Sequence, residues 1–209
     1  MLSLSDIIQI LPAILIALTF HEAAHGYVAY KLGDNTAKDA GRLTINPIKH
    51  IDPLGLIALL VFRFGWAKPV PVDPRNFKHP RRGMALTALA GPVTNLLLGF
   101  ISILICAIIL ISPSYNRFLS AFSVFLIFLA QINVGLAIFN LIPIPPLDGS
   151  RLLTLLLPQK AVFYLYKYER YIMLAVIALL MFGVLSGPLS IARQYVISWM
   201  WGAVRWIVM

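Results

Sequence analysis

The chain consists of long apolar runs separated by short basic stretches. A bilayer core about 30 Å thick needs roughly 20 apolar residues in a helix. Four runs reach or approach this length, namely Ile7–Tyr30, Met84–Ile111, Phe118–Ile142 and Tyr171–Ile191. Leu54–Phe64 is shorter and predicts a re-entrant or interfacial segment, whereas Tyr195–Val208 fits either an interfacial helix or a last short span. The pattern predicts an all-α, polytopic helical membrane bundle with about four to six transmembrane segments.

The composition agrees with this class. Of 209 residues, 60% are hydrophobic and only 12% charged, whereas soluble domains carry about a quarter charged residues. We therefore expect one membrane-embedded domain, residues 1–209, in contact with the lipid bilayer. The net charge of +9 comes from basic residues between the apolar runs, which indicates topology rather than a nucleic-acid surface. The single cysteine, Cys106, excludes a disulfide framework.

The distribution of basic residues predicts the orientation. Residues 31–83 contain ten Lys and Arg, residues 149–170 contain four, and residues 112–117 contain one. Cytoplasmic loops carry the excess of positive charge. We therefore expect a multi-pass protein of the cytoplasmic membrane, with the N-terminus outside and residues 31–83 and 149–170 inside. No basic stretch precedes the first run, so we expect an uncleaved first span rather than a signal peptide.

A candidate metal site lies toward the cytoplasmic end of the first run, at His21-Glu22-Ala23-Ala24-His25. Two histidines four residues apart lie on one face of a helix, where both can bind a zinc ion, and the glutamate beside them can take a proton from water. A chance match is the alternative. It is disfavoured because three ionisable groups in an apolar helix are costly to bury unless they are paired or bind a metal.

A catalytic zinc site needs a third protein ligand, and Asp148 is the best candidate. It follows the Phe118–Ile142 run, whose end the predicted topology puts on the same side as His21 and His25. Prolines at 143, 145 and 146 must interrupt the helix there. The alternative is that Asp148 only caps a helix in a solvated loop.

Taken together, these motifs resemble the site-2 protease family of intramembrane zinc metalloproteases, in its short bacterial and archaeal branch. The resemblance covers about residues 10–155 and rests on an ordered set of motifs: HEAAH at 21–25, GRLTINPIKHIDP at 41–53, GWAKPVPV at 65–72, AGPVTN at 90–95, and NLIPIPPLDG at 140–149. No PDZ insertion or CBS domain is recognisable, so we expect neither PDZ filtering of substrates nor nucleotide sensing.

The resemblance implies a role for each matched residue. His21, His25 and Asp148 would bind one zinc ion per chain, and Glu22 would be the general base. Asn140 would be catalytic and substrate-binding, because it would hold the substrate carbonyl or the oxyanion. The expected substrates are single-span membrane proteins, such as anti-sigma factors or other signalling proteins. The oligomeric state is not indicated.

Polar residues in the later runs suggest supporting roles. Asn133 and Asn140 lie seven residues apart and face the same side of a helix, and for Asn133 we expect a hydrogen bond between helices. Asn95 fits either support of the metal site or simple packing. For His50, with Asp52 and His79, ordinary loop residues are favoured over a gating or metal-binding role.

The proline-rich segment that begins at Trp66 fits two interpretations. It forms either an extended, β-like, membrane-associated edge that pairs with an unwound substrate, or a plain connector. The first makes four residues substrate-binding candidates: Trp66, Lys68, Pro69 and Val70.

Two alternatives to an intramembrane protease stay open from the sequence. One is a membrane zinc hydrolase that acts on a peptide outside the membrane or on a lipid. The other is a metal-ion or proton transporter that uses the same His, Glu and Asp cluster. The transporter predicts ion flux and no need for Glu22 as a base, and the chain lacks a visible inverted repeat.

Overall fold

The computed structural model describes the backbone of residues 4–55, 58, 65–113 and 116–208, and side chains from Ile10 onward. Within these residues the fold is helical, and the only β-type pairing is an isolated antiparallel bridge between Ile51 and Ala67. The predicted all-α class is confirmed. The predicted extended segment around residues 66–70 stays a prediction, because a single bridge does not make a strand.

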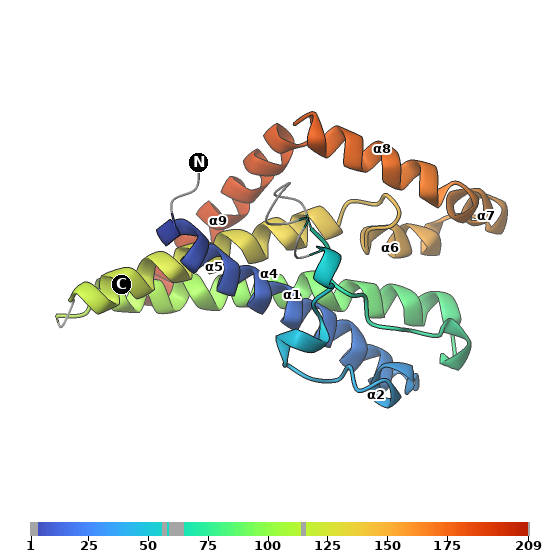
Figure 1. Ribbon diagram of the computed structural model, residues 1–209, viewed down its shortest axis with the longest axis horizontal. Helices are drawn as coiled ribbons and strands as arrows, with labels where there is room; N and C mark the ends of the chain where they lie inside the picture. Colours follow the sequence, from blue (N-terminus) through green and yellow to red (C-terminus); the bar gives the residue numbers. More distant parts are fainter. Residues whose placement is uncertain (1–3, 56–57, 59–64, 114–115, 209) are drawn as a thin grey trace.

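The elements follow one another in the order α1 (Leu4–Lys31), α2 (Thr36–Asp39), η1 (Pro47–Lys49), η2 (Pro74–Asn76), α4 (Pro80–Leu110), α5 (Arg117–Asn140), α6 (Gly149–Leu156), α7 (Gln159–Lys167), α8 (Glu169–Met181) and α9 (Ser186–Val208). Figure 1 shows α4 and α5 side by side along the long axis, with α1 crossing them. The chain then returns through α6, α7 and α8 before α9 packs against α5 and α4.

Two of the predicted spans correspond to single helices of sufficient length. Among the described residues, α4 and α5 are each long and apolar enough to cross a membrane, with mean hydropathies of 2.6 and 2.2. The first predicted span, Ile7–Tyr30, lies within α1, whose 28 residues reach about 42 Å at 1.5 Å per residue. The total number of spans stays a prediction.

The predicted fourth span, Tyr171–Ile191, is wrong as a single helix. Helix α8 ends at Met181, the chain turns, and α9 begins at Ser186, with an angle of 80° between the two helices. Gly183 adopts a positive φ of 73°, the conformation that commonly ends a helix at its C-terminus. The predicted run continues through this turn because Gly183 and the Ser186-Gly187-Pro188 stretch have apolar residues on both sides.

The structure describes one of the two shorter apolar runs well and the other only in part. Tyr195–Val208 is the greater part of α9, and Met200 and Val204 from this helix are buried against α4 and α5. The predicted re-entrant segment Leu54–Phe64 lies mostly outside the described residues.

Two glycines bring α4 close to its neighbours. A Cβ at Gly99 would lie 2.9 Å from Val134 Cγ2 of α5, and a Cβ at Gly91 would lie 2.6 Å from the imidazoles of His21 and His25 on α1. Small residues allow such close approach of helices in a membrane. Gly99 adjoins an apolar core of α4, α5 and α9, formed by Ile103, Ala130, Val134, Met200 and Val204. Gly91 adjoins the predicted metal site.

Candidate metal centre

The three residues predicted to bind a metal lie together. Asp148 Oδ2 is 3.1 Å from His21 Nε2 and 3.3 Å from His25 Nε2, and one ligand atom of each residue lies within 4.8 Å of the others. Both histidines are buried, and Asp148 is partly buried. The cluster joins residues that are 127 positions apart in the chain, as the topology argument predicted.

Local structure explains how each ligand reaches this point. His21 and His25 are one turn apart on α1, and their rings meet edge to face with centroids 4.5 Å apart. Asp148 occupies the residue before α6 but makes no side-chain capping bond, so the capping alternative is not supported. A Cβ at the next residue, Gly149, would lie 2.3 Å from the Leu141 carbonyl oxygen. This close turn after α5 brings Asp148 back toward α1.

The outer nitrogen of each histidine is held by a hydrogen-bond acceptor. His25 Nδ1 donates to the Thr87 carbonyl at 2.7 Å, and His21 Nδ1 donates to Asn95 Oδ1 at 2.5 Å. A carbonyl oxygen can only accept, so these bonds assign the proton to Nδ1 and leave Nε2 with a lone pair. The partner of the second nitrogen commonly fixes the tautomer of a metal-binding histidine in this way.

Asn95 is itself fixed by further buried hydrogen bonds. Its Nδ2 donates to the Ala17 carbonyl at 3.1 Å and to Asn133 Oδ1 at 2.6 Å. Asn133 Nδ2 donates to the Leu129 carbonyl at 2.8 Å. These bonds require that Asn95 present its oxygen, and not its amide nitrogen, to His21. The hydrogen bond between helices predicted for Asn133 is confirmed, and Asn95 supports the metal site as well as helix packing.

The cluster fits a zinc ion. Two imidazole nitrogens and a carboxylate oxygen are the donor types that zinc binds, and three protein ligands leave a coordination position open. Donor atoms this close together repel one another unless a metal ion or protons lie among them, and Gly91 leaves the space beside the rings that a Cβ would fill.

Glu22, the predicted base, contacts the proline-rich segment. Its Oε2 accepts a hydrogen bond from the Val70 N–H at 2.8 Å. Two residues earlier, the Lys68 N–H donates to the His50 carbonyl at 2.9 Å, and Arg42 donates to the Lys68 carbonyl at 2.5 Å. The segment therefore lies against α1 beside Glu22, and Val70 is the predicted substrate-binding residue that reaches the site directly.

Asp34 holds the C-terminal end of this segment in place through hydrogen bonds. This buried carboxylate accepts hydrogen bonds from the Asp73 N–H at 2.8 Å, from Asn76 Nδ2 at 2.7 Å, and from the N–H and hydroxyl of Thr36. Burial raises the pKa of Asp34, but the bonds from Thr36, Asn76 and Asp73 lower it more, so the pKa lies below its ordinary value.

The other candidates have separate places. Asn140 Nδ2 donates to the Leu136 carbonyl of its own helix at 3.1 Å, and no hydrogen bond joins it to the cluster among the described residues. Trp66 is 48% exposed. His50 is buried and donates through Nε2 to the Thr44 carbonyl. Asp52 accepts from the N–H groups of Leu54 and Gly55.

Comparisons with known proteins show which family the chain resembles. A family model described as Peptidase family M50 matches residues 108–184. The chain is 49% identical over 149 residues to a Bacillus subtilis protein named "Putative zinc metalloprotease YwhC", covering 69% of this chain and 67% of that protein. No solved structure matches.

Two mycobacterial proteins, each named "Putative zinc metalloprotease Rip2", are also similar to this chain. The one from Mycolicibacterium smegmatis is 32% identical over 142 residues, covering 65% of this chain and 52% of its own length. The one from Mycobacterium tuberculosis is 28% identical over 206 residues, covering 96% of this chain and 73% of its own length.

Proposed function

The chain belongs to peptidase family M50 and is a membrane zinc metalloprotease that hydrolyses peptide bonds, and we propose that it cuts its substrates within or near their transmembrane segments. In this proposal the whole chain, residues 1–209, forms one membrane-embedded protease domain. His21, His25 and Asp148 hold the zinc ion, and Glu22 is the general base.

The convergence of His21, His25 and Asp148 next to Glu22, in a fold whose α4 and α5 are long and apolar enough to cross a membrane, is the observation that carries the proposal. Their ligand atoms lie within 4.8 Å of one another although they come from distant parts of the chain. A transporter built on the same residues would need a pathway for ions rather than a base. The family and the named relatives favour a protease over that alternative.

Each protein group then has a chemical task. Zinc, when bound, acts as a Lewis acid and lowers the pKa of a water ligand toward about 7. His21 and His25 keep their Nε2 lone pairs available, because Asn95 and Thr87 accept the Nδ1 protons. Glu22 takes the proton of the attacking water and passes it to the leaving amine. The hydrogen bond from Val70 keeps the Glu22 carboxylate on the side of α1 that faces the proline-rich segment.

A substrate helix must unwind before it can react. Each carbonyl in a transmembrane helix is bonded within the helix, so the scissile bond becomes accessible only when several of these bonds open. We propose that the segment Trp66–Val70 and the side chain of Asn140 bind the released backbone groups. Val70 supports this role through its contact with Glu22, while Asn140 must turn away from the Leu136 carbonyl to take part.

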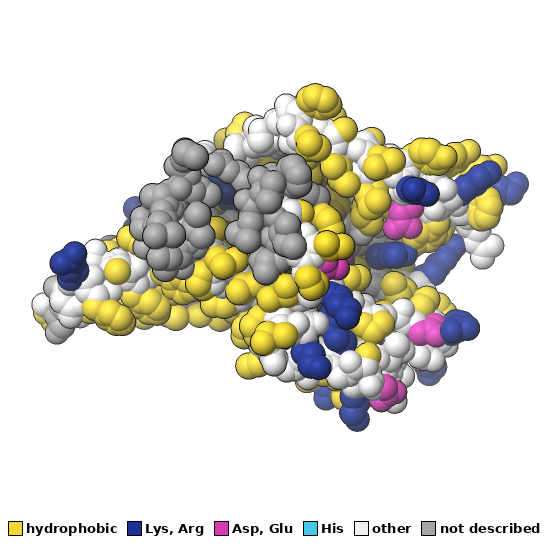
Figure 2. Space-filling view, in the orientation of Figure 1, with side chains coloured by type: hydrophobic (Ala, Val, Ile, Leu, Met, Phe, Trp, Pro, Cys, Tyr) yellow, Lys and Arg dark blue, Asp and Glu magenta, His cyan; other side chains and the backbone are white. Residues whose placement is uncertain are grey.

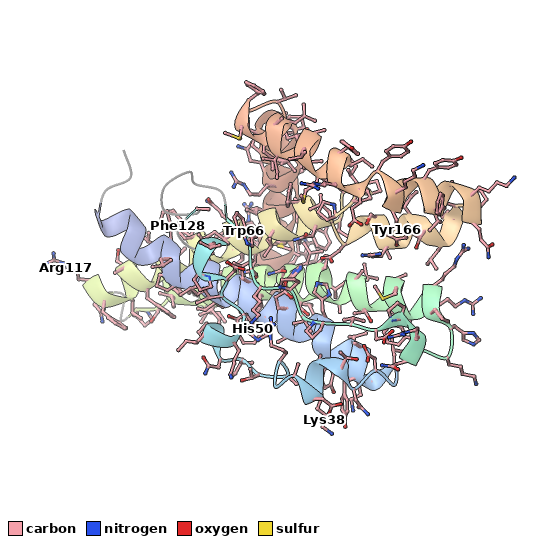
Figure 3. The ribbon with its side chains drawn as sticks, turned by 45° about the vertical axis from the view of Figure 1, so that its right-hand side comes forward. Lys38, His50, Trp66, Arg117, Phe128 and Tyr166 are labelled. Atoms are coloured by element: carbon pink, nitrogen blue, oxygen red, sulfur yellow. The ribbon has the colours of Figure 1, made fainter. Side chains whose placement is uncertain are left out.

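The charge distribution supports an active site on the cytoplasmic side of the cell membrane. Figure 2 shows Lys and Arg gathered over the end of the molecule that carries α2 and α7, whereas apolar side chains cover the length of α4 and α5. Arg117 lies alone at the opposite tip (Figure 3). The basic end faces the cytoplasm by the positive-inside rule. Single-span signalling proteins, including anti-sigma factors, are the proposed substrates.

The zinc content of purified protein tests the site. We expect about one zinc ion per chain in the wild type and a loss of zinc in His21→Ala and in Asp148→Ala, since three ligands are needed. His79→Ala and Asp39→Ala are matched controls, because both residues are exposed and neither is near the cluster. Zinc retained in Asp148→Ala would refute the assignment of the third ligand.

Cleavage of a single-span peptide in liposomes tests the activity. We expect Glu22→Gln to bind zinc normally and to lose cleavage at least about 1,000-fold, because the base is removed while the three zinc ligands stay in place. Normal turnover by Glu22→Gln would exclude Glu22 as the base. Zinc flux into liposomes without cleavage would favour the transporter.

A further inference from the structure

A cavity of about 340 Å³ lies beside the candidate metal centre and has no role in the chemistry described above. Its walls come from α1, α5, α9 and the segment around Trp66. The residues used below are Leu15, Leu18, Trp66, Gly135, Phe139 and Arg193. Figure 3 labels Trp66 and His50, which come from different stretches of the chain and both line the cavity.

The cavity lies about one turn of α1 from Glu22. Leu15, Leu18 and Glu22 are spaced three and four residues apart on α1, so they lie on one face of the helix. Leu18 is one turn from Glu22, a rise of about 6 Å. On the facing segment, Trp66 lines the cavity, and Val70, four residues later, bonds Glu22. An occupant of the cavity therefore lies one or two residues along a peptide from the bond that Glu22 attacks.

The size of the cavity limits what can occupy it. A volume of about 340 Å³ lies in the range of small-molecule pockets, and it can take a single large side chain with part of an unwound backbone. The walls are mainly apolar, with aliphatic side chains from α1 and aromatic ones at Trp66 and Phe139. This chemistry suits an apolar side chain.

Gly135 and Arg193 form the side opposite α1. A Cβ at Gly135 would lie 3.6 Å from Arg193 Cδ, in ordinary contact, so the missing side chain leaves the space open rather than relieving a clash. Arg193 is half-buried and has no hydrogen-bond acceptor among the described residues. Its guanidinium can donate to a carbonyl oxygen that unwinding of the substrate has freed.

We propose that this cavity is a specificity subsite, which receives one large apolar side chain of the substrate next to the scissile bond, and that Gly135 sets its size. This inference rests on the proposed protease function. It predicts a preference for Leu, Met or Phe over Ala at one position near the cut. Apolar pockets discriminate between side chains by about 10- to 200-fold in kcat/KM.

The test uses the full-length zinc-loaded protein in liposomes with a pool of synthetic single-span peptides of about 25 residues. One central position at a time is Ala, Leu, Met, Phe or Trp, and mass spectrometry locates and quantifies each cut. We expect the wild type to favour Leu over Ala about tenfold or more at one position. Gly135→Leu fills the cavity and should reduce this ratio to about one, whereas Phe139→Ala enlarges it and should raise the ratio of Trp to Leu several-fold.

Gly202→Leu is the matched control, because a Cβ at Gly202 on α9 meets no atom within 4 Å. It should keep the wild-type preference. If Gly135→Leu loses zinc and so reports misfolding, Phe139→Ala decides the matter. An unchanged preference in a zinc-loaded Gly135→Leu or Phe139→Ala protein would overturn the subsite alone. No cleavage by the wild type, or cleavage that survives in Glu22→Gln, would instead overturn the proposed function.

Discussion

Helix α4 approaches one neighbour through Gly91 and another through Gly99, and the two contacts differ in kind. At Gly99 the neighbouring atom is Val134 Cγ2, within the apolar core of α4, α5 and α9. At Gly91 the neighbouring atoms belong to His21 and His25, and the hydrogen bonds from His21 to Asn95 and from Asn95 to Asn133 adjoin them. The same small residue permits helix packing in one place and a metal site in the other.

This difference predicts which substitutions should reduce zinc binding and which should reduce the stability of the fold. The Gly99 contact depends on the fit of apolar surfaces, where an extra atom costs packing energy. The Gly91 contact depends on the direction of two lone pairs, where an extra atom displaces ligands. Variants that are matched in chemistry but placed at the two contacts should therefore separate zinc binding from stability.

The largest effect is expected for Gly91→Ala. A Cβ there would lie 2.6 Å from His25 Nε2 and from Cε1 of both rings, so the imidazoles must move and the ligand set is lost. We expect zinc content to fall from about one to well below one ion per chain and cleavage to fall at least about 100-fold. Zinc measured by mass spectrometry, together with the cleavage rate, checks this.

Gly99→Ala is the matched variant. Its Cβ would lie 2.9 Å from Val134 Cγ2, and the β-branched valine has little freedom to rotate away. We expect a loss of stability of about 1–3 kcal/mol with zinc content unchanged. Equal loss of zinc in the two variants would show that the two contacts do not differ in the proposed way.

The next effect is expected at Asn95. Asn95→Ala removes the acceptor of the His21 Nδ1 proton, so the imidazole loses its fixed orientation. Loss of such a partner typically weakens metal affinity about 10- to 100-fold. Asn133→Ala leaves that acceptor in place and removes only a bond to Asn95, so its effect on zinc affinity should be smaller. Competition with a zinc chelator ranks the two variants, and the reverse order would contradict this chain of support.

The sequence identified the candidate ligands more clearly than the groups that hold them in place. His21, Glu22 and His25 follow from helical spacing, and Asp148 follows from the end of a predicted span. Thr87 acts through its backbone carbonyl and Val70 through its backbone N–H, which every residue except proline offers. No residue type marks such positions.

Two further outcomes have similar physical reasons. The role of Asn95 depends on the close approach of α1 and α4 at Gly91. This approach lets Asn95 accept a hydrogen bond from His21, which lies 74 positions earlier in the chain. The break between α8 and α9 depends on the backbone conformation of Gly183, in a run with apolar residues on both sides. Hydropathy reports burial in lipid, and it carries little information on where one helix ends and the next begins.

A moderate effect on stability and cleavage is expected at Asp34. This residue accepts a hydrogen bond from the Asp73 N–H, near the end of the segment that carries Val70. The folded pKa of Asp34 lies below its ordinary value of about 3.9. Its stabilising contribution is therefore present above about pH 4 and is lost as the pH falls through the lowered folded pKa. Asp34→Asn should remove this acid-dependent part of the thermal stability and should reduce cleavage several-fold at neutral pH.

Asp39→Asn is the control for this change, because Asp39 is exposed at the end of α2. Thermal unfolding of wild type and both variants between about pH 3 and pH 6 covers the relevant range. Zinc content should stay at the wild-type level in Asp34→Asn, since Asp34 touches none of the ligands. A pH profile identical to that of the wild type would exclude Asp34 as the titrating group.

The smallest effect is expected for Thr87→Val, and it sharpens the distinction between backbone and side-chain support. The Thr87 carbonyl accepts from His25, but the buried Thr87 hydroxyl has no hydrogen-bond partner among the described residues. Replacing an unpaired buried hydroxyl by a methyl group of similar shape is nearly neutral or stabilising. Zinc affinity and cleavage should stay within about twofold of the wild type, with unfolding temperature unchanged or slightly raised. A large loss of zinc in Thr87→Val would mean that the hydroxyl, and not only the carbonyl, supports the site.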